Sequence, residues 1–141
     1  MALNLEKLYA KFRDIEESVA RLRQFGEISQ EQFLADRDNL DIASFRLIVA
    51  TEAAIDTCLH ICAKLLKIVP ADYAACFYLL AEHGLIHDDL ANRLAEMARF
   101  RNLPIHRYWH LDYHRVYELI TGPDLNGLMD FMKHVGRLIA K

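Results

Sequence analysis

The sequence predicts an all-α protein, an antiparallel helical bundle of about five to six helices with one long central helix. Apolar residues recur at spacings of three and four along most of the chain, and no segment alternates apolar and polar side chains with a period of two. The connections between the periodic segments are short. With 141 residues, of which 53% are hydrophobic, the chain can form one compact core, so we expect a single domain over residues 1–141.

The first expected helix carries a continuous apolar stripe, which consists of Leu5, Leu8, Phe12, Ile15, Val19, Leu22 and Phe25. Gly26 follows the stripe and is expected to end the helix. Ser29 and Gln32 have the spacing of a capping box. We therefore expect a short second helix that runs through Leu34.

The long central helix is expected from Asp38 to Val69, because this range contains no Gly or Pro and Pro70 follows it. Within it, a polar row recurs at a spacing of four and consists of Glu52, Asp56, His60 and Lys64. We interpret this row as a solvated edge with weak ion pairs along the helix. The alternative is that part of the row faces a cleft or a partner.

Two further helices are expected between Asp72 and Phe100. Asp72 is a suitable N-cap, and Gly84 lies where a C-terminal cap belongs. Asp88 is expected to start the next helix. Pro104 lacks an N–H and crowds the carbonyl four residues earlier, so this helix is expected to end near that position.

The last two helices are expected on either side of a Gly-Pro break. Asp112 is predicted to cap a helix over Tyr113–Thr121, which Gly122 and Pro123 end. Asp124 is expected to start the final helix. Its apolar stripe consists of Leu125, Leu128, Phe131, Met132, Val135, Leu138 and Ile139.

The three cysteines are expected to be reduced thiols in the core. Their number is odd, and Cys58 and Cys62 fall on one helical face, with Cys76 in the next expected helix. A zinc site would need a second pair of ligands, which the histidine positions do not supply.

No run of about 18 uncharged apolar residues occurs, and the N-terminus is amphipathic instead of signal-like. We therefore expect a soluble, cytoplasmic protein without a membrane partner. The net charge is −3, but residues 99–115 are locally basic. Four arginines lie there beside the single acidic residue Asp112, namely Arg99, Arg101, Arg107 and Arg115. Such a patch can attract a phosphate chain to one place, although a chance cluster on a solvated surface would look the same.

Arg101 and His106 are the candidate catalytic pair. An arginine holds an anionic phosphate at any pH, and an imidazole gives or takes a proton near neutrality. Five positions on a regular helix would leave the two side chains about 140° apart. A helix that loosens before Pro104 would let His106 turn back toward Arg101, with the amide of Asn102 beside them.

Cleavage of RNA by its own 2′-OH requires a base, an acid and a cation that stabilises the charge on phosphorus. One histidine cannot easily act as both base and acid. A two-fold dimer would bring two copies of the motif around one phosphate, so we expect a homodimer with a shared interfacial site.

A metal site is the alternative for His106, His110 and His114, which recur at a spacing of four. We discount it because Pro104 and the expected cap at Asp112 interrupt the helix that would align the three rings. No metal and no cofactor are therefore expected.

The run from Phe100 to Trp109, followed by Asp112 and by residues 115–118, closely resembles the HEPN-domain toxins of the HepT-like family. The similarity extends upstream to residues 53–59 and 79–85, and the chain resembles the family from about residue 35 to its end. The family pattern of Arg, four residues, His, one residue and Tyr falls on Arg101, His106 and Tyr108.

This resemblance implies an all-α HEPN fold, a homodimer with the motif at its interface, and a metal-independent endoribonuclease that cleaves RNA and stops growth. It also implies a minimal nucleotidyltransferase (MNT) antitoxin that silences the toxin by transferring AMP to Tyr108. Asn102 would assist catalysis, and Arg99 and Arg107 would contact RNA. An AMP ester on Tyr108 would place phosphate charge close to His106.

Two other interpretations stay open. A non-catalytic HEPN module would bind nucleotide or RNA and serve as a scaffold for the nucleotidyltransferase. A helical assembly protein would use its apolar faces for dimerisation alone, and Tyr108 and Trp109 would then pack in the core or in a subunit interface.

Overall fold

The computed structural model describes residues 3–101 and 112–140, without the side chains of Phe100 and Arg101. Within these ranges the structure contains α-helices, one short π-helix and no strand, which confirms the predicted all-α class. The elements are α1 (Leu5–Phe25), α2 (Gln30–Ala35), α3 (Arg37–Ile61), η1 (Cys62–Leu66), α4 (Tyr73–Glu82), α5 (Asp88–Arg101), α6 (Tyr113–Thr121) and α7 (Asp124–Ala140).

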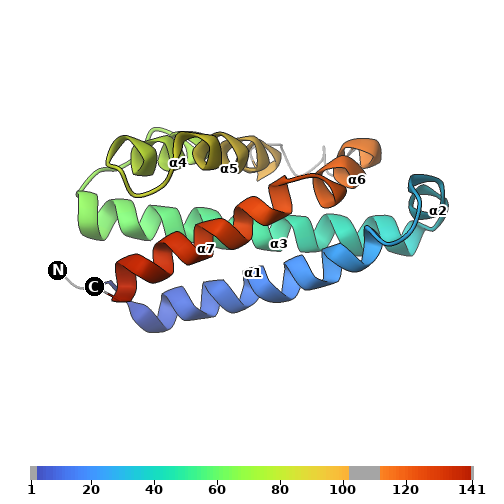
Figure 1. Cartoon of the computed structure of the whole chain (residues 1–141), viewed down its shortest axis with the longest axis horizontal. Coiled ribbons are helices and arrows are strands. Elements are labelled where there is room, and N and C mark those ends of the chain that lie inside the picture. Colours follow the sequence, from blue (N-terminus) through green and yellow to red (C-terminus); the bar gives the residue numbers. More distant parts are fainter. Residues whose placement is uncertain (1–2, 102–111, 141) are drawn as a thin grey trace.

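The four longest helices form an antiparallel bundle. In Figure 1, α1 and α5 run in one direction, and α3 and α7 run in the opposite direction. α3 contacts both α1 and α5, and α7 also packs against both of them. The short helices α2 and α6 contact each other at one end of the bundle, whereas the described N-terminal and C-terminal ends lie at the other (Figure 1).

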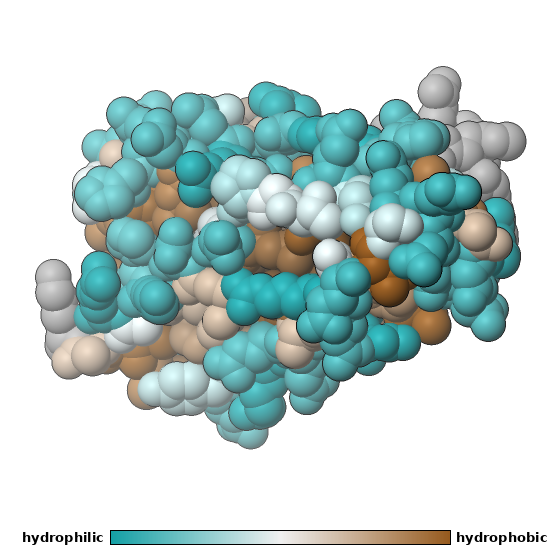
Figure 2. All heavy atoms as spheres, turned by 45° about the vertical axis from the view of Figure 1, so that its right-hand side comes forward, coloured by the Kyte–Doolittle hydropathy of each residue, from teal (hydrophilic) through white to brown (hydrophobic). Residues whose placement is uncertain are grey.

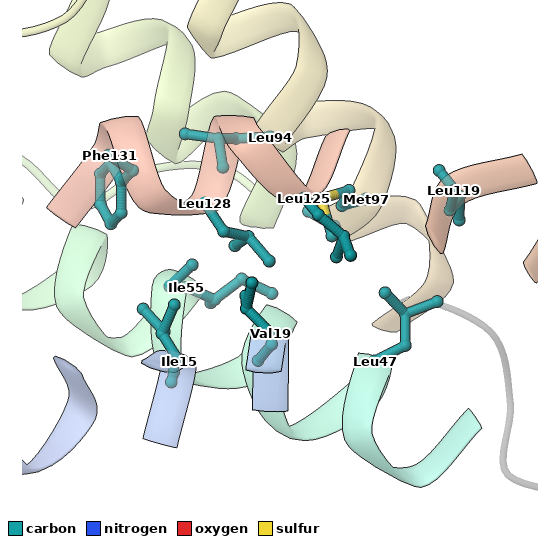
Figure 3. Packing of buried hydrophobic residues seen from close by; sticks show 14 of the residues in the cluster. Ile15, Val19, Leu47, Ile55, Leu94, Met97, Leu119, Leu125, Leu128 and Phe131 are labelled. Carbon is teal, nitrogen blue, oxygen red and sulfur yellow. The ribbon is translucent and has the colours of Figure 1, made fainter. Parts of the chain in front are cut away.

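The core forms where the apolar stripes of these helices meet. Figure 3 shows side chains from α1, α3, α5, α6 and α7 facing one another, among them Val19, Ile55 and Leu128. Phe77 and Phe131 are both buried, and their ring centroids lie 5.7 Å apart in an edge-to-face arrangement. Burial of these stripes is the main contribution to the stability of the bundle. The face drawn in Figure 2 is mainly hydrophilic, with apolar atoms visible between the polar side chains.

The predicted helix ends are confirmed where a local cap defines them. Gly26 is the C-cap of α1, and Ser29 and Gln32 form both bonds of the capping box at α2. Asp72 accepts a hydrogen bond from the N–H of Ala75 at the start of α4. Gly84 follows α4 with a φ of 72°, a conformation that glycine adopts without a steric penalty.

The predicted end of the long helix at Pro70 was wrong. α3 ends at Ile61 and continues as η1 only to Leu66. Lys67 then adopts the left-handed conformation, with φ 58°, and the N–H groups of Lys67 and Ile68 both bond to the carbonyl of Cys62. The wide turn and the left-handed residue stop the helix before proline does. A lysine gives no signal in the sequence for such a cap.

The interpretation of the polar row as a solvated edge was also wrong for His60. This side chain is 8% exposed, and its Nε2 accepts a hydrogen bond of 2.9 Å from the backbone N–H of Asn4. Asp56 is ion-paired with Lys11 of α1 at 3.0 Å, so its partner lies on another helix. Asp56 and His60 therefore face α1 and its N-cap, because α1 packs against this side of α3.

The cysteines also differ from the prediction of three reduced thiols. Cys58 and Cys76 form a disulfide that joins α3 to α4, and Cys62 is a free, buried thiol. The pairing depends on how α4 packs against the end of α3, which helical periodicity does not reveal. Along the described parts of the chain, no helix combines the length and apolar character that crossing a membrane requires.

Candidate functional site

The predicted catalytic motif starts at the C-terminal end of α5. α5 is described as far as Arg101, the first residue of the motif, and the predicted helix end near Pro104 lies outside the described residues. Arg99 lies in the last turn of α5 and is exposed. The side chain of Arg101 lies outside the described part of the structure. So do the other predicted site residues, Asn102, His106, Arg107 and Tyr108.

α6 begins directly after this segment, with Asp112 as its N-cap. The Asp112 carboxylate accepts hydrogen bonds from the backbone N–H groups of His114, at 3.1 Å, and Arg115, at 3.3 Å. Asp112 itself has an extended backbone, with φ −77° and ψ 97°. The predicted cap is therefore confirmed, and no continuous helix runs from His106 through His114. The helical alignment that a three-histidine metal site would need is interrupted at this residue.

His114 contacts the start of α2. Its Nδ1 lies 2.9 Å from the amide Nε2 of Gln30, the first residue of α2. Tyr117, one turn further along α6, donates a hydrogen bond of 2.6 Å to the carbonyl of Ile28 and packs its ring against Phe33. These contacts hold α6 against the α2 region and so determine where the C-terminal boundary of the motif segment lies.

Arg115 joins the two helices that flank the motif. Its guanidinium is ion-paired with Glu96 of α5 and, at 3.1 Å, with Glu118 of α6. The basic character expected for residues 99–115 is therefore reduced, because two carboxylates balance one of the four arginines. This pairing was not predicted, since Glu96 and Arg115 lie on different helices and only the tertiary arrangement brings their side chains together.

Asp124 interacts electrostatically with Arg115 and Arg93. It is the first residue of α7 and is 8% exposed. Burial raises the pKa of its carboxyl, and the positive charges of Arg115 and Arg93 oppose this rise. The N-terminus of α7 also favours a negative charge at this position. We call Arg93, Glu96, Arg115, Glu118 and Asp124 the Arg115 network.

The turn between α6 and α7 keeps the Arg115 network compact. The N–H of Gly122 donates a 2.9 Å hydrogen bond to the carbonyl of Glu118. A Cβ at Gly122 would lie 2.8 Å from that carbonyl oxygen, closer than ordinary contacts allow. Glycine is therefore required for this close approach, which places Asp124 directly after α6. The sequence indicated the break but not its role in assembling these charges.

Residues 15–135 match the family model described as "Ribonuclease HepT-like". A curated relative from Aphanizomenon flos-aquae (strain 2012/KM1/D3), named tRNA nuclease HepT, is 28% identical over 100 residues, which are 71% of this chain and 68% of the relative.

Solved structures of toxin–antitoxin complexes share the fold. A mutant of the MntA–HpeT toxin–antitoxin pair is 25% identical, with a TM-score of 0.82 over 94% of this chain and 98% of the other. The tri-AMPylated Shewanella oneidensis HEPN toxin in complex with MNT antitoxin is also 25% identical, with a TM-score of 0.82 over 93% of this chain and 97% of the other. The likeness spans nearly the whole helical bundle, as expected for the HEPN type.

Proposed function

Because the chain belongs to the family of HepT-like ribonucleases, we propose that it is the toxin of a HEPN/MNT toxin–antitoxin pair and cleaves RNA without a metal. The observation that carries this proposal is the extent of the family match, which includes the whole Arg101 to Tyr108 motif and both helices that flank it. The ion pair between Glu96 and Arg115 supports the proposal, because this pair links the two helices on either side of the motif.

In the proposed reaction, the Arg101 guanidinium binds the scissile phosphate with two parallel N–H donors. His106 removes the proton from the ribose 2′-OH or protonates the departing 5′ oxygen, and Asn102 donates a hydrogen bond to the phosphate. Arg99, exposed at the end of α5, and Arg107 contact the neighbouring phosphates.

A homodimer supplies the second imidazole. One His106 acts as the base while its copy in the second subunit acts as the acid, so that each subunit alone is nearly inactive. Dilution below the dissociation constant of the dimer should therefore reduce the specific activity. An activity that stays constant while sedimentation shows monomers would contradict the shared site.

The proposed partner is an MNT antitoxin that transfers AMP to Tyr108. Support comes from the Shewanella oneidensis HEPN toxin, which is tri-AMPylated in its complex with MNT antitoxin. AMP on Tyr108 would bring phosphate charge and bulk next to His106, where the RNA phosphate binds. Intact-mass analysis of the chain co-expressed with an MNT antitoxin should show added AMP in the wild type and less in Tyr108→Phe.

The proposed substrate class is RNA, with tRNA as the first candidate because the Aphanizomenon flos-aquae relative is named a tRNA nuclease. The decisive experiment expresses the wild type, Arg101→Ala and His106→Ala without the antitoxin, then follows growth and RNA integrity. We expect arrest and cleavage only with the wild type, and cleavage by the purified protein should persist in EDTA.

Matched controls are available on the described surface. Arg13 on α1 and His83 after α4 are both exposed, so Arg13→Ala and His83→Ala remove the same chemical groups elsewhere. Both should remain toxic. Harmless expression of the folded wild type, with intact RNA, would contradict the nuclease and favour the non-catalytic scaffold.

A further inference from the structure

Three cysteine sulfurs converge where α3, η1 and α4 meet. Cys58 lies in α3, Cys62 starts η1 and Cys76 lies in α4, and all three side chains are fully buried. Their sulfurs lie within 4.8 Å of one another, and the Cys62 and Cys76 sulfurs are 3.8 Å apart. None of these residues belongs to the proposed RNA site, so the cluster requires a separate explanation.

The cluster has an oxidised and a reduced form. In the structure, the disulfide between Cys58 and Cys76 leaves Cys62 as the free thiol. A thiol or phosphine reductant that donates two electrons, together with two protons, converts the disulfide into two thiols. The reduced chain then holds three thiols around one point in the core.

The spacing of the sulfurs suits one central atom. Thiolate sulfurs lie about 2.3 Å from a bound ion such as zinc, so three of them around one centre are separated by about 4 Å. The 3.8 Å between the Cys62 and Cys76 sulfurs is close to this separation. All three positions are on helical backbone, which holds them in place without a ligand.

We propose that the reduced cluster is a buried three-thiol site for a thiophilic trivalent centre, with arsenite as the representative ligand. Arsenous acid exchanges its three As–O bonds for three As–S bonds, and each thiol proton leaves in a water molecule. No atom changes its oxidation state, and both the reactants and the product are neutral.

Charge favours this centre over zinc. A divalent ion with three thiolates would leave one negative charge in the apolar core, and burial of an unpaired charge is costly. Burial also raises the pKa of the Cys62 thiol, so burial disfavours a charged thiolate at this position. Structural zinc takes four ligands, whereas the cluster found among the described residues offers three.

Entry of the ligand is easiest at the end of the helix. Cys62 begins the short π-helix, and the helical backbone stops at the left-handed Lys67. Local opening of such an end costs less than unfolding of the bundle. Because the disulfide consumes two of the three thiols, the site exists only under reducing conditions.

The test uses the full chain, reduced with a phosphine that is then removed, and incubated with sodium arsenite. Native mass spectrometry should show one arsenic atom added and three hydrogens lost per chain, and the adduct should survive a challenge with excess glutathione. The unreduced chain should take up none. Absence of arsenic from a reduced chain that keeps its helical circular dichroism would overturn the proposal.

Cys62→Ala tests the third sulfur. This variant keeps Cys58 and Cys76, so it can bind arsenic through only two sulfurs, and excess glutathione should remove that arsenic. If the variant retained as much arsenic as the wild type, the result would contradict a three-thiol site. If this variant does not fold, Cys58→Ala gives the same test. Zinc chloride added to the loaded wild type should leave the arsenic in place, and complete displacement by zinc would refute the preference for a neutral centre.

Discussion

The guanidinium of Arg115, in the first turn of α6, is ion-paired with the carboxylate of Glu96 in α5. α5 is described as far as Arg101 and α6 is capped by Asp112, so this ion pair connects the two helices on either side of the proposed catalytic segment. Both side chains are partly exposed, at 36% and 43%. The contact therefore contributes more to the relative position of the helices than to the stability of the fold.

Glu96→Gln should reduce RNA cleavage far more than it reduces stability. An exposed ion pair contributes about 0.2–1 kcal/mol to the free energy of unfolding, whereas a small misplacement of reacting groups can lower kcat by up to about 100-fold. Single-turnover cleavage and urea unfolding measure the two effects.

The control for this ion pair is Asp41→Asn, which breaks the pairing of Asp41 with Arg37 within α3. This variant should cleave RNA like the wild type. A Glu96→Gln variant with wild-type kcat would show that the ion pair does not position the catalytic segment.

Asp112→Ala should lower both stability and activity. It removes the side chain that accepts the first N–H groups of α6, and loss of such a cap costs about 1 kcal/mol in the free energy of unfolding. Asp112→Asn keeps the acceptor and should lose little. Asp72→Ala removes the equivalent cap of α4 and should cost similar stability while leaving cleavage unchanged. Equal cleavage by the two alanine variants would argue against a role for the α6 cap in the site.

Asp124→Asn should stabilise the protein at neutral pH. The folded-state pKa of Asp124 is raised above its ordinary value of 3.8, mainly by burial. The folded state therefore binds more protons than the unfolded state between these two pKa values, so this group's contribution to stability is lost as the pH rises through the folded-state pKa. Urea unfolding should show a gain for Asp124→Asn at neutral pH that shrinks toward pH 3.8. A loss of stability at neutral pH would mean that attraction to Arg93 and Arg115 outweighs burial.

Protonation of His60 should make the protein less stable in mild acid. Burial, followed by the charges of Lys7 and Lys64, lowers the pKa of His60 below its ordinary value of 6.5. The unfolded state therefore binds more protons, and the stability that His60 contributes above pH 6.5 is lost as the pH falls through the folded-state pKa. Protonation would also remove the acceptor for the Asn4 N–H. Urea unfolding across this range should show a flatter pH dependence for His60→Gln, whereas His83→Gln, at an exposed position, should follow the wild type.

Prediction of the site from the sequence was most accurate at its C-terminal boundary. The capped start of α6 follows from Asp112, and the structure confirms it. The end of α5 near Pro104 stays a prediction, because Pro104 lies outside the described residues. The partners of Arg115 were not predicted, because Glu96 gives no local signal. The geometry of His106 relative to Arg101 stays a prediction, since His106 lies outside the described residues.

The helical class, the caps at Ser29, Asp72 and Asp112, and the resemblance to the HepT-like family could all be predicted from the amino-acid sequence. These features depend on periodicity and on hydrogen bonds that close within about four residues, so they are readable along the chain. Three contacts became visible only in the folded chain: His60 is buried under the start of α1, Cys58 is bonded to Cys76, and Arg115 is ion-paired with Glu96. Each of these contacts joins segments far apart in sequence, and the packing of whole helices brings them together.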